Sequence, residues 1–218
     1  MIANVNNVNL YYEKTGTGQP LILLHGNGES HHIFDTISAK LQNDFTLYAI
    51  DSRNHGQSEQ TEDYSYETMA EDVHALITLL NINPVGFIGF SDGAIISLII
   101  AMKHPHVVSK MALLGVNLKP EDFTEESLQF INETYAETGD PLFRLMLEQP
   151  RIELSEVEEI NIPTLLIAAE NDIFKPESFK RLEAAMPSAT LKIMQGHEHD
   201  SYITDKDILY PDFLRFFK

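Results

Sequence analysis

The sequence predicts a single α/β domain built on an eight-stranded, mostly parallel β-sheet. Strand-length runs of largely apolar residues alternate with helix-length amphipathic stretches, and Gly, Pro, Asn or Asp flanks most of the runs. Strands that are buried on both faces have this continuous apolar character, and their alternation with helices implies parallel pairing through crossovers. A length of 218 residues with 43% hydrophobic residues suits one compact core.

Each element follows from its local pattern. The two short runs around Asn6-Asn7 predict an antiparallel hairpin, because Asn tolerates the positive φ of a tight turn. Apolar residues spaced three or four apart, such as Val73, Leu76 and Leu80, predict the helices. Strands are expected at residues 2–5, 8–12, 20–24, 45–50, 85–89, 110–114, 164–168 and 190–194. Helices are expected at residues 32–41, 66–80, 92–103, 177–185 and 213–217.

The chain is strongly acidic, with 33 Asp and Glu against 15 Lys and Arg and a net charge of −18. Such a surface repels phosphate backbones and anionic lipids, so neither a nucleic-acid nor a membrane partner is expected. No apolar run reaches the ~18–20 residues of a membrane span, and the N-terminus resembles no signal peptide. The absence of cysteine excludes disulfides, thiolate metal sites and cysteine nucleophiles. We expect a cytoplasmic protein.

Residues 118–160 interrupt the alternation. The segment has no apolar strand run and predicts two or three short helices, and its 12 acidic and 3 basic residues carry half of the net charge. These helices either present only a solvated acidic face or also form a cap whose aromatic inner side covers a pocket. We therefore divide the chain into a core, residues 1–117 and 161–218, and a helical cap insertion, residues 118–160. The expected pocket residues are Phe90, Phe130, Phe143 and Met146.

The segment Gly89-Phe90-Ser91-Asp92-Gly93 joins a predicted strand to a predicted helix. A G-x-S-x-G pattern in this context is typical of a nucleophile elbow, in which the serine takes a strained backbone conformation. Side chains two positions from the serine would collide with the neighbouring strand and helix, and glycine avoids both collisions. The Ser91 hydroxyl would then stand at a helix N-terminus, where partial positive charge favours a developing anion. The alternative is a Gly-rich turn with an incidental serine.

A second glycine-rich segment, Leu24-His25-Gly26-Asn27-Gly28, directly follows a predicted strand. A loop in this position can direct a backbone N–H at an oxyanion. The N–H of Asn27 is the expected donor, with the amide of Asp92 as its partner. His25 is expected to organise the loop by hydrogen bonding rather than to react.

These two motifs, with Asp-Ser-Arg-Asn-His-Gly-Gln-Ser at 51–58 between them, resemble the α/β-hydrolase superfamily. They most resemble its small esterase-like members with a serine nucleophile. The resemblance covers essentially the whole chain outside 118–160, where the family places its variable cap, and it implies the α/β-hydrolase fold. It also implies a Ser–acid–His triad in that chain order, with the acid after the strand that follows the cap and the histidine after the last strand.

Both of these implied positions are occupied. Asp172 follows the strand at 164–168 and is assigned as the acid, with Glu170 as the alternative. His197 and His199 both follow the last strand, and composition does not choose between them. The family's usual ending, a strand, a short glycine-containing loop and then histidine, favours His199 and places His197 inside the loop. His197 stays open, because Gly196-His197 matches the family's frequent Gly-His pair.

The other histidines are given structural roles. Asp51, Arg53 and His55 are expected to be structural hydrogen bonders. His31 and His32 either line the mouth of the pocket or are solvated at the start of a helix, and we expect the latter. The His-x-His pair at 197 and 199 superficially resembles a metal site, but no third ligand with suitable spacing is apparent. There is also no Gly-x-Gly-x-x-Gly or P-loop motif. We therefore expect no metal and no organic cofactor.

The elbow and the resemblance together predict a serine hydrolase that cleaves a small ester-like acyl substrate through an acyl-enzyme. The same triad serves thioesterases, amidases, perhydrolases and carbon–carbon bond hydrolases, and the sequence does not separate them. Some proteins of this fold are instead small-molecule receptors or signalling proteins that keep an intact triad. A receptor would react at most about once, whereas an enzyme would turn over. The oligomeric state is not readable from the sequence.

Overall fold

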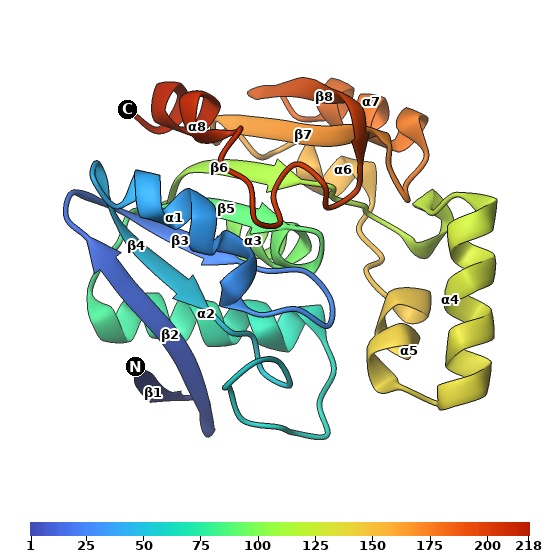
Figure 1. Ribbon diagram of the computed structural model, residues 1–218, viewed down its shortest axis with the longest axis horizontal. Helices are drawn as coiled ribbons and strands as arrows, with labels where there is room; N and C mark the ends of the chain where they lie inside the picture. The colour runs from blue at the N-terminus through green and yellow to red at the C-terminus, as the bar shows by residue number, and fades with distance from the viewer.

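The computed structural model describes all 218 residues and contains one eight-stranded sheet with helices on both faces (Figure 1). The strands lie in the order β1-β2-β4-β3-β5-β6-β7-β8. β2 pairs antiparallel with β1 and β4, and the other pairings are parallel, so the predicted fold class is confirmed. The strands are β1 Ile2–Val5, β2 Val8–Gly16, β3 Gln19–Leu24, β4 Phe45–Ile50, β5 Val85–Phe90, β6 Val108–Leu114, β7 Thr164–Asn171 and β8 Ala189–Glu198.

The helices agree closely with the predicted ranges, and α2 and α3 agree to the residue. α2 begins after Ser65, whose side chain accepts the Thr68 N–H, and ends at Asn81 in the left-handed region, which is how a helix is commonly capped. No helix is both long and apolar enough to span a bilayer. The helices are η1 His31–Phe34, α1 Asp35–Leu41, α2 Tyr66–Leu80, α3 Asp92–Lys103, η2 Pro105–Val107, η3 Pro120–Asp122, α4 Glu125–Thr138, α5 Pro141–Glu148, α6 Leu154–Val157, α7 Pro176–Ala185 and α8 Tyr210–Phe217, where η marks a 3₁₀ turn.

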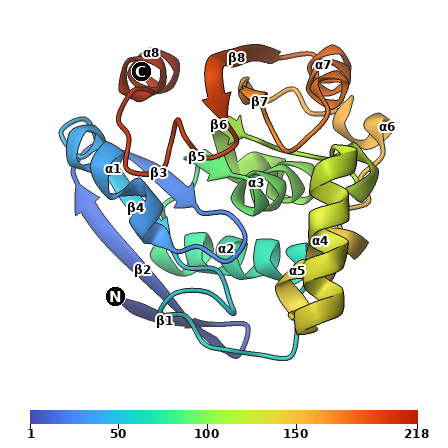
Figure 2. The same ribbon diagram turned by 45° about the vertical axis from the view of Figure 1, so that its right-hand side comes forward.

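Two hydrophobic layers enclose the sheet. On one face α2, α3 and α7 bury side chains such as Leu76, Ile99 and Leu182 in the larger cluster. On the other face α1 and α8 bury Ile37 and Phe213 in the smaller cluster. Figure 2 shows α1 and α8 away from α2 and α3, on opposite sides of the strands. The inner strands β3, β5 and β6 are therefore largely buried on both faces, which explains their mostly apolar sequences, whereas the edge strand β8 is more polar and more exposed.

The predicted cap segment, 118–160, contains η3, α4, α5 and α6. α4 and α5 pack against each other and stand beyond the carboxyl ends of the parallel strands (Figure 1). The base of the segment is tied to the loop that follows β7, because Thr124 N–H donates to Ile173 O at 2.9 Å and Lys175 N–H donates to Asp122 O at 2.8 Å. The helices thus lie at the edge of the sheet where Ser91 is also found.

The prediction that His31 is solvated is wrong. The helix expected at 32–41 begins with the 3₁₀ turn η1, and His31 is only 2% exposed. Its backbone N–H donates to Asp51 Oδ1 at 2.7 Å, and its ring Nδ1 lies 2.8 Å from the same oxygen. His31 is buried because the buried carboxylate of Asp51 requires hydrogen-bond donors, and His31 supplies them. His32, in contrast, is exposed as expected.

A buried ion pair holds the loop between β4 and α2. Arg53 donates to Asp72 through Nε at 2.6 Å and through Nη2 at 2.9 Å. Asn6 donates to the same carboxylate through Nδ2 at 3.1 Å. Asp72 is 1% exposed. The structural roles expected for Asp51 and Arg53 are confirmed by these contacts.

Replacing Asp72 by Ala should destabilise the fold by about 3 kcal/mol, because it leaves the buried Arg53 guanidinium without its main partner. Chemical denaturation followed by circular dichroism measures the free energy of unfolding. Glu67→Ala on the same helix is the control, since its ion pair with Lys103 is exposed and should be worth less than about 1 kcal/mol. Equal losses in the two variants would contradict the role of the buried pair.

Candidate active site

Ser91 occupies a sharp turn between β5 and α3. Its φ of 51° and ψ of −114° are strained for a residue with a side chain, and its N–H is held by Leu114 O at 2.8 Å. A Cβ at Gly89 would lie 2.3 Å from Gly93 O, and a Cβ at Gly93 would lie 2.0 Å from Leu24 O. These approaches are impossible for any side chain, so the two glycines are required for the turn to form.

Three predicted residues meet at this turn. His199 Nε2 lies 3.2 Å from Ser91 Oγ, and His199 Nδ1 lies 2.8 Å from Asp172 Oδ1. Asp172 is held in turn by the N–H groups of Ala169 at 3.0 Å and Phe174 at 3.3 Å. A continuous hydrogen-bonded chain therefore runs from a buried carboxylate through an imidazole to a hydroxyl.

The two alternatives lie elsewhere. Glu170 is exposed, and its carboxylate accepts the N–H of Gly196 at 2.7 Å. His197 Nδ1 lies 3.0 Å from Ser201 Oγ and has no contact with Ser91. The expectation that His197 falls inside a loop is wrong, because β8 continues to Glu198, which pairs with Asn171 after a bulge in β8 at residues 195–197. His199 is the first residue beyond the strand.

Gly115 is a site residue that sequence reasoning missed. It follows β6 with a φ of +56°, and a Cβ there would lie 2.5 Å from Cε1 of His199. The imidazole is further enclosed by the rings of Phe90 and Phe174, whose centroids lie 4.9 Å and 5.4 Å from its own. The space that Gly115 leaves is thus filled by the histidine. A single glycine at a strand end carries no sequence signal for this.

The two residues whose N–H groups are the predicted oxyanion donors contact each other through their side chains, because Asn27 Nδ2 donates to Asp92 Oδ2 at 3.0 Å. The backbone N–H of Asp92 belongs to the first turn of α3 and so has no acceptor within the helix. Asp92 also accepts the Tyr66 hydroxyl at 2.7 Å. Burial raises the pKa of the Asp92 carboxyl and, more strongly, the pKa of Tyr66. Sequence reasoning assigned no role to Tyr66, which lies 25 positions before Ser91 in another helix.

A cavity of about 860 Å³ opens above Ser91 and His199. All four predicted pocket residues, Phe90, Phe130, Phe143 and Met146, line it. Phe130 is 63% exposed, so it stands at the rim, and its ring meets that of Phe143 at a centroid distance of 6.4 Å. The cavity is therefore bounded by the elbow on one side and by α4 and α5 on the other.

Comparison with known proteins places this arrangement in a family. A family model described as the alpha/beta hydrolase fold matches residues 19–151, which is more than half of the chain. The chain belongs to the alpha/beta hydrolase family. The matched range contains the strands that carry the Asn27 loop and the Ser91 turn.

Several relatives of this alpha/beta hydrolase are known. The uncharacterized hydrolase YraK of Bacillus subtilis (strain 168) is 25% identical over 205 residues, which is 87% of this chain and 74% of that protein. The meta-cleavage product hydrolase of Pseudomonas fluorescens IP01 superposes with a TM-score of 0.85 at 18% identity, over 100% of this chain and 97% of that one. An esterase from a marine microorganism superposes with a TM-score of 0.81 at 23% identity, over 95% and 98% of the two chains. The relatives support a hydrolase, and the two structures show the shared fold.

His25 has the structural role that the sequence predicts. Its Nε2 accepts the Ser52 N–H at 3.1 Å, and its Nδ1 lies 2.8 Å from Gly26 O. Burial lowers the pKa of its imidazole to about 4, so the ring is neutral at neutral pH. His55 stands beside it and contacts the carbonyl of Arg53 at 2.9 Å. Both histidines of this alpha/beta hydrolase therefore shape the loops behind the site.

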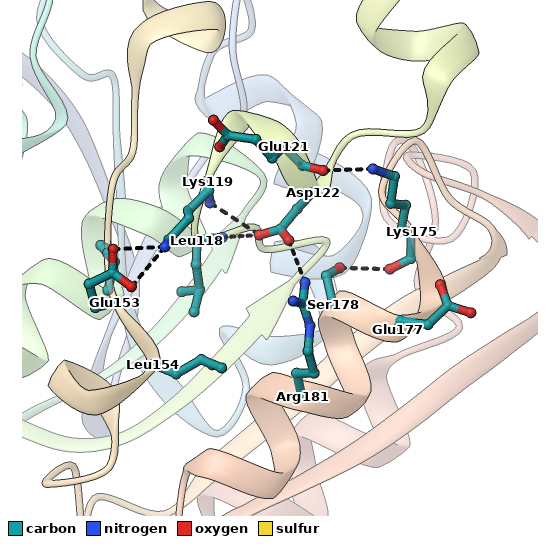
Figure 3. Close-up of a pocket in the computed structure, with 11 residues that line it drawn as sticks. Leu118, Lys119, Glu121, Asp122, Glu153, Leu154, Lys175, Glu177, Ser178 and Arg181 are labelled. Atoms are coloured by element: carbon teal, nitrogen blue, oxygen red, sulfur yellow. Dashed lines mark hydrogen bonds and ion pairs between the residues drawn. The ribbon is translucent and has the colours of Figure 1, made fainter.

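A second cavity, of about 510 Å³, lies where the predicted cap segment meets α7 (Figure 3). Figure 3 shows Asp122 accepting from the backbone of Leu118 and Lys119 and from Arg181, while Lys119 reaches Glu153. The Lys175 ammonium donates to the carbonyl of Glu121. Lys119, Lys175 and Arg181 therefore each have an acceptor. The cavity is thus a structural junction between the segment and the core.

One group of side chains has the composition of a metal site. The ligand atoms of Glu71, His74 and His104 lie within 4.8 Å of one another on α2 and at the end of α3. The two imidazoles stack at a centroid distance of 3.6 Å, and the Lys103 ammonium lies 3.8 Å from the Glu71 carboxylate. Parallel rings do not aim their nitrogens at a common point, and the lysine already neutralises the carboxylate. These contacts favour a structural cluster between the two helices.

Replacing Gly115 by Ala should displace the His199 ring, because the new methyl group would overlap Cε1. A crystal structure of the variant should show Nδ1 of His199 beyond hydrogen-bonding distance of Asp172. The reactivity of Ser91 toward a fluorophosphonate should fall about 100-fold, as is usual for a displacement of about 1 Å in a catalytic geometry.

Gly139→Ala is the matched control for this substitution. Gly139 ends α4 with a φ of +66°, so alanine meets the same backbone strain, but no atom lies within 4 Å of the added carbon. Its Ser91 reactivity should equal that of the wild type. A Gly115→Ala protein with an unmoved ring and unchanged reactivity would show that His199 does not depend on this space.

Proposed function

We propose that the protein is a serine hydrolase that cleaves an ester-like acyl substrate through an acyl-enzyme intermediate. One observation carries the proposal: a continuous hydrogen-bonded chain from Asp172 through His199 to Ser91 at the floor of a cavity. A buried carboxylate that fixes an imidazole beside a serine is the arrangement that general-base activation of the hydroxyl requires.

In the proposed reaction, His199 Nε2 takes the proton of Ser91 as Oγ attacks the carbonyl carbon. The Asp172 carboxylate holds Nδ1–H and stabilises the imidazolium that forms. His199 then gives the proton to the leaving oxygen, and the alcohol departs as the acyl–oxygen bond breaks. A water molecule, deprotonated by the same imidazole, attacks the acyl-enzyme and releases the acid and the free serine.

The oxyanion of the tetrahedral intermediate would be bound by the N–H groups of Asn27 and Asp92. Each such donor is worth about 3 kcal/mol of transition-state stabilisation in enzymes where one has been removed. The side-chain hydrogen bond between Asn27 and Asp92 supports this proposal, since it links the two residues that carry the donors before substrate arrives. Preorganised donors need no rearrangement as charge develops.

We also propose that residues 118–160 act as a cap that governs the choice of substrate, on a core formed by 1–117 and 161–218. Phe130, Phe143 and Met146 support this role, because all three come from the segment and line the cavity above Ser91. The marine esterase with a similar fold is compatible with an ester substrate for this chain. Because the cap residues are separate from the catalytic residues, substrate choice can vary while the chemistry stays the same.

The proposal predicts that a fluorophosphonate labels the protein once, at Ser91, and that chromogenic esters are turned over many times. Ser91→Ala should abolish both, and His199→Ala should lower kcat by several orders of magnitude, because it removes proton transfer. Mass spectrometry locates the label, and steady-state assays measure turnover.

His197→Ala is the matched control for His199→Ala. Its ring contacts Ser201 rather than Ser91, so the variant should keep most of its kcat. A reversed ranking of the two histidine variants would overturn the assignment. A protein that reacts once per molecule with every ester and never turns over would instead behave as a receptor.

The cap proposal predicts that Phe130→Ala and Phe143→Ala lower kcat/KM for long-chain acyl esters by about tenfold relative to short-chain ones, through loss of apolar contact area. A series of p-nitrophenyl esters of increasing acyl length provides the measurement. Leu79→Ala removes an exposed side chain of α2 outside the cavity and should leave the profile unchanged. An unchanged profile in both phenylalanine variants would contradict the cap's role.

A further inference from the structure

The active-site cavity is lined by charges of one sign. Its lining contains no Lys and no Arg. The acidic residues in it are Glu29, Glu126, Asp172, Glu198 and Asp200. Asp172 is engaged with His199, and Glu126, Glu198 and Asp200 are exposed at the rim, where solvent screens them. Glu29 differs from all of these, because it is half-buried beside the nucleophile.

Glu29 lies in the loop after β3, two residues beyond the proposed oxyanion donor Asn27. Its Oε2 accepts the N–H of Gly26 at 2.8 Å. A Cβ placed on Gly26 would meet Glu29 Oε2 at 2.7 Å and Ser91 Cβ at 3.1 Å, so the carboxylate and the nucleophile pack against the same glycine. The Glu29 carboxyl group therefore lies close to the place where a substrate carbonyl would meet Ser91.

The Glu29 carboxyl has no cationic partner in the protein. No Lys, Arg or His forms an ion pair with it, and no group of the chain donates to Oε1. Burial raises its pKa to about 7; the neighbouring His199 lowers the pKa, while Asp200 and Asp92 raise it. A half-buried carboxylate without a counter-charge is costly, and a ligand cation placed beside it would relieve that cost.

Aromatic rings line the cavity into which this carboxyl group faces. Phe90, Phe130 and Phe143 line the same cavity. Carboxylate together with aromatic faces is the combination that recognises alkylammonium groups, because the ring faces attract a weakly hydrated cation and the carboxylate supplies the opposite charge. A small inorganic cation would lose more hydration free energy at this place than its interactions with the carboxylate and the rings would supply.

We propose that Glu29 makes the cavity select esters that carry an alkylammonium group, over neutral esters of the same shape. The inference rests on the proposed serine hydrolase function and names its substrate class. The chemistry is unchanged, since water still cleaves the acyl–oxygen bond, and the ammonium group takes no part in it. Glu29 acts on the charge of the bound substrate, and its ionised form is the selecting one.

The test compares butyrylcholine with 3,3-dimethylbutyl butyrate, which has carbon in place of the cationic nitrogen. In the wild type, kcat/KM should favour the choline ester by roughly tenfold above pH 7. The preference should decline as the pH falls through about 7, because Glu29 is then protonated and uncharged. The ratio of the two esters cancels any effect of pH on the catalytic steps that both esters share.

Glu29→Gln should bring the ratio close to one at every pH, while its amide oxygen can still accept the Gly26 N–H. Glu125→Gln is the matched control: it changes the net charge equally, but Glu125 is exposed on α4 and outside the cavity lining. The control should keep the wild-type ratio and its pH dependence. A ratio that is the same in the wild type and Glu29→Gln overturns the inference.

Failure of this inference is distinguishable from failure of the proposed function. If the wild type cleaves both esters equally well, the protein is still a hydrolase, but Glu29 does not select the substrate. Where neither ester turns over, choline is added during fluorophosphonate labelling of Ser91. Choline should slow the labelling of the wild type about tenfold more than that of Glu29→Gln, and equal protection in both overturns the inference.

Discussion

The close crossing of α3 over β3 is the constraint on which the rest of the site depends. The Cα of Gly93 lies so near to Leu24 O that not even a methyl group fits between them. The first turn of α3 is thereby pressed against the carboxyl end of β3, and Ser91, just before it, is forced to a φ of 51°. The energetic cost of that conformation is offset by packing in the surrounding core, since α3 is buried along almost its whole length.

The acid directly after the nucleophile, Asp92, is tolerated because two other segments supply hydrogen-bond donors to it. Asp92 is buried, which raises its pKa and would destabilise the fold if the carboxyl group lacked partners. Tyr66 and Asn27 provide two donors, from α2 and from the loop after β3. Satisfied polar groups in a core specify one arrangement rather than several. The Asp92 carboxyl group therefore links three separate segments around Ser91.

The sequence could predict the parts of the site whose positions follow from chain order. Ser91 could be located because a G-x-S-x-G turn between strand and helix has one geometric solution, and Asp172 because the resemblance to the α/β-hydrolases implies an acid after the strand that follows the cap. The choice between His197 and His199 depended on where β8 ends, and hydrogen bonding from β7 extends that strand four residues beyond its apolar core. Strand ends are set by the neighbouring strand, which a local pattern does not contain.

Residues that act through proximity across the fold could not be found in this way. Gly115 and Tyr66 have ordinary local sequence contexts, and their contacts join segments that lie far apart in the chain. Glu29 bonds to its own loop, but only the fold brings it to the cavity that Ser91 and the cap helices line. His31 shows the same limit, because a polar residue at a helix start is normally solvated, and only the buried Asp51 makes it otherwise. Polar residues drawn inward by a tertiary partner escape a hydropathy pattern.

The two backbone hydrogen bonds at the base of the helical segment 118–160 have a consequence for the exchange of such segments between proteins of this fold. Thr124 N–H and Asp122 O pair with the loop that carries Asp172, so the first residues of the segment brace the acid as well as leading to α4. A graft whose junction lies after Thr124 keeps this brace, whereas a junction at Leu118 replaces it. The proposed cap should therefore be exchanged from α4 onward, because the residues before α4 support the loop that carries Asp172.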